Sequence, residues 1–238
     1  MNFGWVMMSL KKKDNAFATM IFCFLIAASH SVYAGGIALG STRIIYPIGD
    51  KQVSLPIINS DDKNVYLIQS WVDDFKGNKT TSFVVTPPLF VINPKRENIL
   101  RIMYAGDDLP LDRESVFYFN SKAIPSVDKS KVTGNSLQIA TQSVIKLFMR
   151  PKNLPTRSLD APESLRCNLG VGTINIHNSS PYYVTLVQLR IGGKLLPNTM
   201  ISPKSSKDVA IPSGDSGEIT FQTVNDYGAN TPKQICKN

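Results

Sequence analysis

The sequence contains few of the residues on which enzymes and metal sites depend. Its 238 residues include only two histidines and three cysteines, and Cys23 and His30 fall within the first 34 positions. Beyond them only Cys167, Cys236 and His177 remain. A zinc site needs three or four such ligands at short spacings, and a cysteine–histidine nucleophile would have to be built around His177. We therefore expect no metal, no cofactor and no catalytic residues.

Long runs of one residue type are also scarce. After residue 34, lysines and arginines are spread along the chain, with no basic cluster interleaved with aromatic residues of the kind that binds nucleic acid. No later stretch is apolar enough to span a membrane. No stretch of about 11 residues or more shows the 3.6-residue apolar period of a helix. The net charge of +8 therefore indicates a solvated basic surface and no nucleic-acid partner.

The first 34 residues have the pattern of a secretory signal peptide. Lys11, Lys12 and Lys13 precede the apolar stretch 16–28, and small or tolerated residues stand at 32 and 34, before the expected cleavage site. A membrane anchor is the alternative, but this stretch is shorter than the roughly 20 residues that cross a bilayer. We expect cleavage after residue 34 and export to the periplasm.

Export places the remaining two cysteines, Cys167 and Cys236, in an oxidising compartment. Two cysteines in such a compartment are expected to form a disulfide. A loop of this length would contribute on the order of 4 kcal/mol to stability in the entropic model.

What the chain does contain is short strands. Its 15 glycines and 15 prolines are scattered among segments rich in β-branched and aromatic residues. Strands are predicted at residues 37–45, 52–59, 66–73, 89–92, 97–104, 115–123, 136–149, 165–177, 182–191, 194–195, 206–211 and 217–224. The prolines at 151 and 155 end the longest run. The sequence thus predicts an all-β protein of two immunoglobulin-like sandwich domains, 35–154 and 155–238.

Two cations stand in apolar surroundings. If residues 37–45 form one strand, Arg43 shares the apolar face of Ile37, Leu39 and Ile45. Lys146 lies among apolar neighbours near the end of the strand 136–149. A charge in such a place is costly unless it is paired. Either each cation forms an internal ion pair or reaches solvent, or both meet at one site that binds an anion.

The same strand alternates apolar and polar side chains. Leu137, Ile139 and Thr141 alternate with Gln138 and the polar or small residues that follow. The strand is either an ordinary half-buried strand or an exposed edge offered to another chain, since exposed apolar edges are otherwise selected against.

A series of segments in this order resembles the periplasmic pilus chaperone family. They are residues 40–46 (GSTRIIY), 69–73 (QSWVD), 85–90 (VTPPLF), 100–104 (LRIMY), 109–120 (LPLDRESVFYFN), 123–125 (AIP), 137–140 (LQIA), 145–151 (IKLFMRP), 180–185 (SPYYVT) and 225–228 (NDYG). The resemblance implies two immunoglobulin-like domains at an angle, with a cleft between them. The short segment between Pro125 and Ser136 is similar to that of the short-loop branch.

The resemblance also implies a binding mechanism. Arg43 and Lys146 match the cleft residues that bind the C-terminal carboxylate of a pilus subunit. The strand near 136–149 matches the strand that the chaperone donates to the subunit, with Leu137, Ile139 and Thr141 entering its groove. Thr141 departs from the family, which usually has a large aliphatic residue there. An unbroken strand would place Lys146 on the opposite face from Leu137 and Ile139, so we expect a twist or a bulge.

Three further residues match an ion network between the domains of the family. These are Glu114, Arg150 and Asp226, and the network is expected to hold the interdomain angle; ordinary surface pairing is the alternative. A cysteine near the C-terminus, like Cys236, occurs in some members, usually with a closer partner than Cys167.

The function that follows is that of a periplasmic chaperone without enzymatic activity. It would bind, fold and cap pilus subunits and deliver them to an outer-membrane usher. A secreted immunoglobulin-like structural or adhesive protein of a surface fibre is the alternative. Self-association through the donor-strand edge remains open.

Overall fold

The computed structural model describes residues 35–126, 137–212 and 216–238. Residues Gly36–Asn238 form one compact unit, separate from Met1–Gly35. The predicted signal peptide lies outside the described residues. In the part of the chain that is described, no helix is long and apolar enough to cross a membrane.

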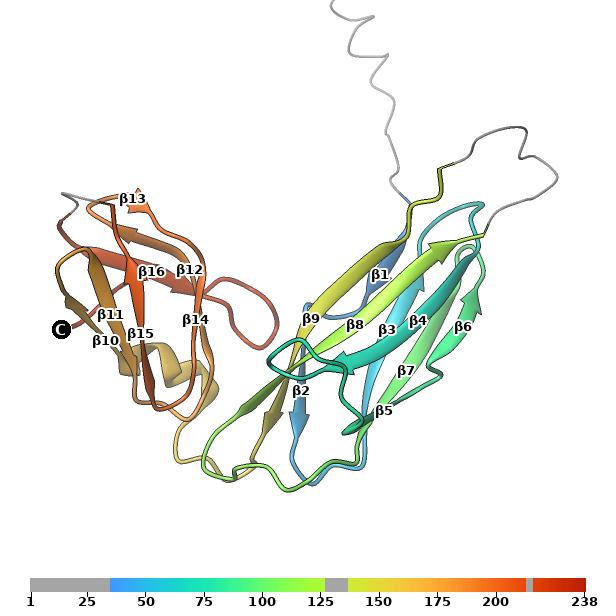
Figure 1. The fold of residues 1–238 in the computed structure, drawn as a ribbon, viewed down its shortest axis with the longest axis horizontal. Helices are drawn as coiled ribbons and strands as arrows, with labels where there is room; N and C mark the ends of the chain where they lie inside the picture. Colours follow the sequence, from blue (N-terminus) through green and yellow to red (C-terminus); the bar gives the residue numbers. More distant parts are fainter. Residues whose placement is uncertain (1–34, 127–136, 213–215) are drawn as a thin grey trace, which may run out of the picture. The chain divides into compact units, whose positions relative to one another are not determined.

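The first domain is a sandwich of two sheets (Figure 1). One sheet has the order β1-β3-β7-β5 and the other β2-β9-β8-β4-β6. The strands are β1 (Ile37–Leu39), β2 (Arg43–Pro47), β3 (Val53–Asn59), β4 (Tyr66–Asp73), β5 (Phe83–Thr86), β6 (Leu89–Ile92), β7 (Glu97–Tyr104), β8 (Ser115–Pro125) and β9 (Thr141–Arg150). All neighbouring strands are antiparallel except β2 and β9, which are parallel.

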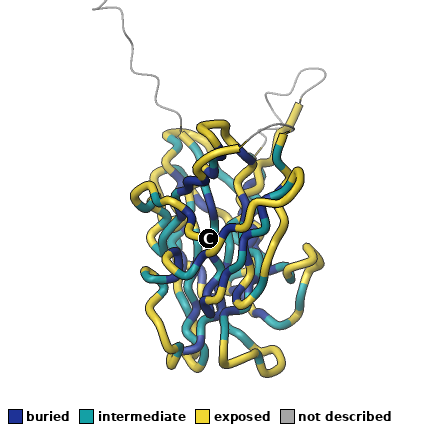
Figure 2. The backbone as a smooth tube through the Cα atoms, turned by 90° about the vertical axis from the view of Figure 1, so that its left-hand side faces the viewer, coloured by how far each residue is buried: buried dark blue, intermediate teal, exposed yellow. Residues whose placement is uncertain are grey.

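The core of this domain follows from the two-residue period of its strands. In β4, Ile68 and Val72 are buried and Gln69 between them is exposed. The two sheets meet over a cluster of fully buried apolar side chains that includes Leu55, Leu100 and Phe119. Figure 2 shows the buried positions mostly toward the middle of the view and exposed positions in the outer loops.

The second domain is also a sandwich. Its sheets have the orders β10-β11-β15 and β13-β12-β16-β17, with β14 paired to β12. The elements are the short 3-10 helix η2 (Ser158–Ser164) and strands β10 (Leu165–Leu169), β11 (Thr173–Asn178), β12 (Val184–Ile191), β13 (Lys194–Leu195), β14 (Thr199–Ile201), β15 (Ser205–Ala210), β16 (Ile219–Thr223) and β17 (Gln234–Ile235). The predicted all-β, two-domain fold is confirmed.

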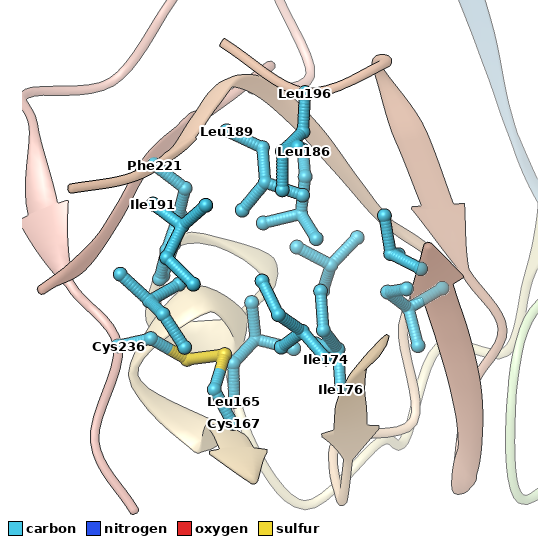
Figure 3. Close-up of a cluster of buried hydrophobic side chains, with 14 of the residues drawn as sticks. Leu165, Cys167, Ile174, Ile176, Leu186, Leu189, Ile191, Leu196, Phe221 and Cys236 are labelled. Atoms are coloured by element: carbon cyan, nitrogen blue, oxygen red, sulfur yellow. A yellow bond between two sulfur atoms is a disulfide. The ribbon is translucent and has the colours of Figure 1, made fainter. Parts of the chain in front are cut away.

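The predicted disulfide is present. Cys167 in β10 is bonded to Cys236, just after β17, so the bond joins the two sheets of the second domain. Both cysteines are buried, and Figure 3 shows the bond packed beside Leu165, Ile174 and Ile176. The disulfide therefore fastens the C-terminal segment to the core.

Two predicted strands are in fact split, in each case at glycine. Residues 165–177 form a hairpin, β10 and β11, which turns at Gly170 and Gly172; Gly172 has a φ of +73°. Residues 37–45 form β1 and β2, which belong to different sheets. The backbone N–H of Gly40 donates to Pro56 in the first sheet, and β2 starts in the second. The short strands β5, β14 and β17 were not predicted.

Candidate functional site

Arg43 and Lys146 lie side by side. Arg43 opens β2, and the parallel register pairs it with Lys146 of β9. The prediction that Arg43 shares the core face was wrong. Because β2 begins only at Arg43, its own alternation applies: Ile44 and Tyr46 are buried in the core, and Arg43 lies on the outer face of the sheet.

Arg43 is nevertheless half-buried, because residues of the second domain contact it. Its Nη1 donates a hydrogen bond of 3.0 Å to the carbonyl oxygen of Val224, and its guanidinium lies 6.0 Å from the ring centre of Phe148. Its Nε is buried and has no hydrogen-bond partner among the described residues. Burial lowers the pKa of the guanidinium, although the charges of Asp226 and Glu114 oppose that effect. A buried donor without an acceptor is uncommon.

Lys146 also lacks a carboxylate partner. Its Nζ lies 3.4 Å from Thr185 Oγ1 of β12, to which it donates. No ion pair of the described residues includes Arg43 or Lys146. Burial lowers the pKa of Lys146, and the positive charges of Arg43 and Lys207 lower it further. The internal ion pairs considered from the sequence are therefore absent from both cations in the described structure.

Next to this pair, Arg150 binds two carboxylates. Its Nε donates to Glu114 Oε1 at 2.6 Å, and its Nη1 and Nη2 donate to the two oxygens of Asp226 at 2.7 and 2.8 Å. Glu114 also accepts from the backbone N–H of Tyr183, and Asp226 accepts from Ser158 Oγ. The structure thus brings together the three residues that the sequence grouped.

Burial and the neighbouring charges shift the pKa values of this network in opposite directions. Burial raises the pKa of Glu114, against the positive charge of Arg150. Burial alone would also raise the pKa of Asp226, but hydrogen bonds and charge from Arg150 lower it overall. For Arg150, burial would lower the pKa, and the two carboxylates raise it overall. The guanidinium is thus held in its charged form.

The interdomain contacts that were not predicted include two outside the Arg43–Lys146 pair and the ion network. Lys204 Nζ lies 2.7 Å from Asp112 Oδ2, and Arg113 holds the same carboxylate, which lowers the pKa of Asp112. Gly228, with a φ of +84°, lies so close to Thr42 that a Cβ would overlap the threonine hydroxyl. The one sequence signal for the first contact is the position of Asp112, two residues before Glu114 of the ion network. The sequence carries none for the second, because side-chain spacing along one strand does not report approach between domains.

The edge of β9 is free over its first half. β8 pairs with residues 141–149, whereas β2 pairs only with residues 146–150. Within the described residues, no strand covers the β2 side of residues 141–145. The chain that precedes Arg43 leaves this edge at once, since Gly40 is bonded to the other sheet. On this side, the backbone N–H and C=O groups of residues 141–145 are therefore unpaired. They lie along the line that β2 would follow if it continued before Arg43.

The predicted donor strand differs in length and shape from the observed one. It was expected near 136–149, but β9 begins at Thr141, opposite Ala123, and residues 137–140 are not in a strand, although β8 continues to Pro125. Leu137 and Ile139 are 87% and 65% exposed. Of the twist or bulge that was expected, no bulge is present between residues 141 and 149, where the register is unbroken. Thr141 and Lys146 therefore lie on opposite faces of the sheet.

Comparisons with known proteins agree with one another. A family model described as "Pili and flagellar-assembly chaperone, PapD N-terminal domain" matches residues 36–155, and one described as "Pili assembly chaperone PapD, C-terminal domain" matches residues 160–235. The chain is 48% identical to the "Probable fimbrial chaperone SfmC" of Escherichia coli K12, over 90% of this chain and 93% of that protein. It is also 48% identical to the "Chaperone protein FimC" of the same strain, over 83% of each.

Solved structures give the same result. The periplasmic chaperone SfaE is 44% identical, with a TM-score of 0.76, over 85% of this chain and all of that one. The SafB chaperone of Salmonella enterica, solved in complex with the SafA pilin, is 26% identical, with a TM-score of 0.78, over 87% and 99% of the two chains. The residues that the two family models match, 36–155 and 160–235, include both β-sandwich domains and the positions of Arg43 and Lys146.

Proposed function

Because the chain belongs to the pilus-assembly chaperone family, we propose that it binds pilus subunits in the periplasm through Arg43, Lys146 and the free edge of β9. It would cap and fold each subunit and deliver it to an outer-membrane usher. The SafB chaperone, a relative at 26% identity, has been solved with a pilin, which supports a pilus subunit as the partner. Residues 1–34 would direct export as a signal peptide.

The observation that carries this proposal is the buried, unpartnered Nε of Arg43 next to a lysine without an acid. A carboxylate bound here would accept from Arg43 and from Lys146. Such hydrogen bonds between charged groups are the strong kind. They would also offset the free-energy cost of burying two like charges side by side.

The direction of β2 explains why the anion should be the end of a chain. A strand that adds to the free edge at residues 141–145, parallel to β9, follows the line of β2 and reaches Arg43 with its C-terminus. β2 itself occupies the edge from Arg43 onward, so the added strand must stop there. Its terminal carboxylate then lies at Arg43 and Lys146. This is strand addition, in which backbone hydrogen bonds supply affinity and side-chain pockets supply selectivity.

The remaining residues take supporting roles in this proposal. Leu137, Ile139 and Thr141 would enter an apolar groove of the subunit, and the exposure of the first two leaves them available. Glu114, Arg150 and Asp226 would fix the domains, 35–154 and 155–238, relative to each other. A second copy of the chain could occupy the same edge when no subunit is present.

Lys146→Met is expected to separate binding from stability. Hydrogen bonds to a charged group contribute about 1.5–3 kcal/mol, so loss of Lys146 should weaken binding about ten- to hundredfold. The probe is a peptide of alternating apolar residues, as long as residues 137–145, with a free C-terminal carboxylate, measured by calorimetry. Because burial disfavours the charge of Lys146, the melting temperature of the variant should be unchanged or higher.

The same peptide with an amidated C-terminus is the matched control. It should bind the wild-type chain at least as weakly as the free peptide binds the Lys146→Met variant, because amidation removes the carboxylate that both Arg43 and Lys146 would bind. Equal binding of the free and amidated peptides would rule out the carboxylate site.

Ile139→Asp tests the donated strand. Burying an aspartate in an apolar groove is costly, so co-purification of a co-expressed pilus subunit should fall about tenfold or more. Ile139 is 65% exposed in the free chain, so the variant should stay folded. The control is Val171→Asp, which makes the same kind of change at a fully exposed valine of the second domain. Subunit recovery that is equal for both variants would argue against donation by this segment.

A further inference from the structure

Three hydrogen-bonded side chains cross the sheet that carries the free edge of β9. Gln142 Nε2 of β9 donates to Asn120 Oδ1 of β8 at 2.9 Å, and Asn120 Nδ2 donates to Asp73 Oδ2 of β4 at 2.8 Å. The three strands are neighbours (Figure 1), and all three side chains lie on the face that points away from the core. Asp73 and Asn120 end two of the segments that carry the family resemblance, 69–73 and 109–120, yet neither takes part in the binding proposed above.

The charge of Asp73 sets the direction of these hydrogen bonds. An ionised aspartate only accepts, so the amide nitrogen of Asn120 must face Asp73. The amide oxygen of Asn120 then faces Gln142, which has to donate. Asn120 is 1% exposed, and its nitrogen also donates to the carbonyl oxygen of Tyr118. Because this amide is buried, both of its ends depend on these partners, and the network holds Gln142 in one orientation.

The network fastens the least supported part of β9. In the described structure, residues 141–145 pair with β8 alone, and residues 137–140 before them are not in a strand. The end of a strand with one neighbour opens easily, since few contacts hold it. Gln142 is the second residue of β9, so its hydrogen bond ties this end to β8 and, through Asn120, to β4.

We propose that Asp73 and Asn120 are positioning residues, which act through Gln142 to keep the free edge of β9 in strand conformation for a partner chain. This inference rests on the proposed function, in which the end of a pilus subunit adds to residues 141–145. A segment that is ordered before binding loses less conformational entropy when the partner arrives. The buried Asn120 would thus raise the affinity for the partner without contacting it.

Gln142→Ala tests the network at an exposed residue, where the variant should keep the wild-type melting temperature. The probe is the peptide used for Lys146→Met, with a free C-terminal carboxylate. It should bind about two- to tenfold more weakly, which corresponds to the roughly 0.5–1.5 kcal/mol that a hydrogen bond between neutral groups contributes. In the free variant, the amides of residues 141–145 that are bonded to β8 should exchange with solvent faster by a similar factor.

Gln69→Ala is the matched control. Gln69 is an exposed glutamine of β4, and it lies on the same face as Gln142, since both are opposite Lys122 of β8. Its side chain makes no hydrogen bond to any described residue. This variant should bind the peptide with the wild-type affinity and leave the exchange of residues 141–145 unchanged.

Asn120→Leu separates positioning from direct contact with the peptide. Leucine is close to asparagine in size but offers no acceptor to Gln142. Because Asn120 is buried, its replacement removes no contact with the peptide, so weaker binding would come from the loosened edge of β9. Both variants remove the same hydrogen bond, so combining them should weaken binding no more than Gln142→Ala alone. A further loss on adding Gln142→Ala would show that Gln142 contacts the peptide itself and would overturn the inference.

The outcomes separate this inference from the proposed function. Unchanged affinity or unchanged exchange in Gln142→Ala would exclude the positioning role, also if Asn120→Leu does not fold. The proposed function would still stand if Lys146→Met or amidation of the peptide lowers the affinity. If the peptide does not bind the wild-type chain at all, both are contradicted.

Discussion

Arg150→Ala is expected to lower the free energy of unfolding by about 3–5 kcal/mol, the cost of removing one partner from a buried ion pair. The variant would leave Glu114, which is 3% exposed, and Asp226 without their cation. Urea denaturation at neutral pH measures the difference. The loss should be large because Arg150 is hydrogen-bonded to both acids at once. Without it, each acid would carry a charge that is held away from water and has no cation beside it.

The loss in free energy of unfolding caused by Arg150→Ala should become smaller as the pH falls. Without Arg150, burial favours the neutral form of both carboxyls, so they take up protons at a higher pH in the folded variant than in its unfolded state. A group with such a raised folded pKa costs stability above its unfolded pKa, and the cost disappears as the pH falls through that range. Denaturation at pH 7 and near pH 4 would show the change.

Arg157→Ala is the matched control for this experiment. Arg157 makes a similar pair of hydrogen bonds, to both oxygens of Asp160, but its side chain is 79% exposed. Exposed pairs contribute up to about 1 kcal/mol. A loss of stability in Arg150→Ala no greater than in Arg157→Ala would show that the network adds nothing beyond surface pairing.

Removal of the disulfide is the second large effect. Cys167→Ala combined with Cys236→Ala should destabilise the second domain by roughly 4 kcal/mol, since the bond closes a loop between residues 69 apart. The bond also holds the C-terminal segment, where Cys236 N–H donates to Ile219 and Cys167 N–H donates to Lys237. Hydrogen exchange of these two amides should become faster in the variant.

Reduction of the wild-type protein provides the comparison for this variant. Reduced wild type and the double variant should unfold at similar urea concentrations, both well below the oxidised protein. Exchange in β4 and β8 of the first domain should not change, because the disulfide lies wholly within the second domain. A loss of stability under about 1 kcal/mol would contradict the role assigned to the bond.

Much of the candidate site was accessible from the sequence because particular residues conflicted with their surroundings. Lys146 was noticed as a cation among apolar residues, and it does lie half-buried without an acid. Arg43 was noticed for a reason that proved wrong. Its supposed place on a core face assumed one strand through Gly40, where the chain in fact changes sheets. Its burial comes instead from Val224 and the second domain.

Lys204 shows what local patterns do not contain. It is an exposed lysine in a turn. Its ion pair depends on Asp112, which lies in the other domain. A two-residue alternation reports which side of its own strand a residue occupies, and nothing about the strand of another domain.

The sequence by itself determined the all-β class, the two domains, the family and the pair of cysteines. These properties follow from local alternation, turn residues, composition and the order of short motifs. The tertiary structure alone decided that Arg43 and Lys146 are paired through parallel strands, that the edge of β9 is free before them, and that Val224 and Thr185 of the second domain contact them. The reason is that strand pairing and domain contacts join residues far apart in the chain, and packing of the whole molecule selects them.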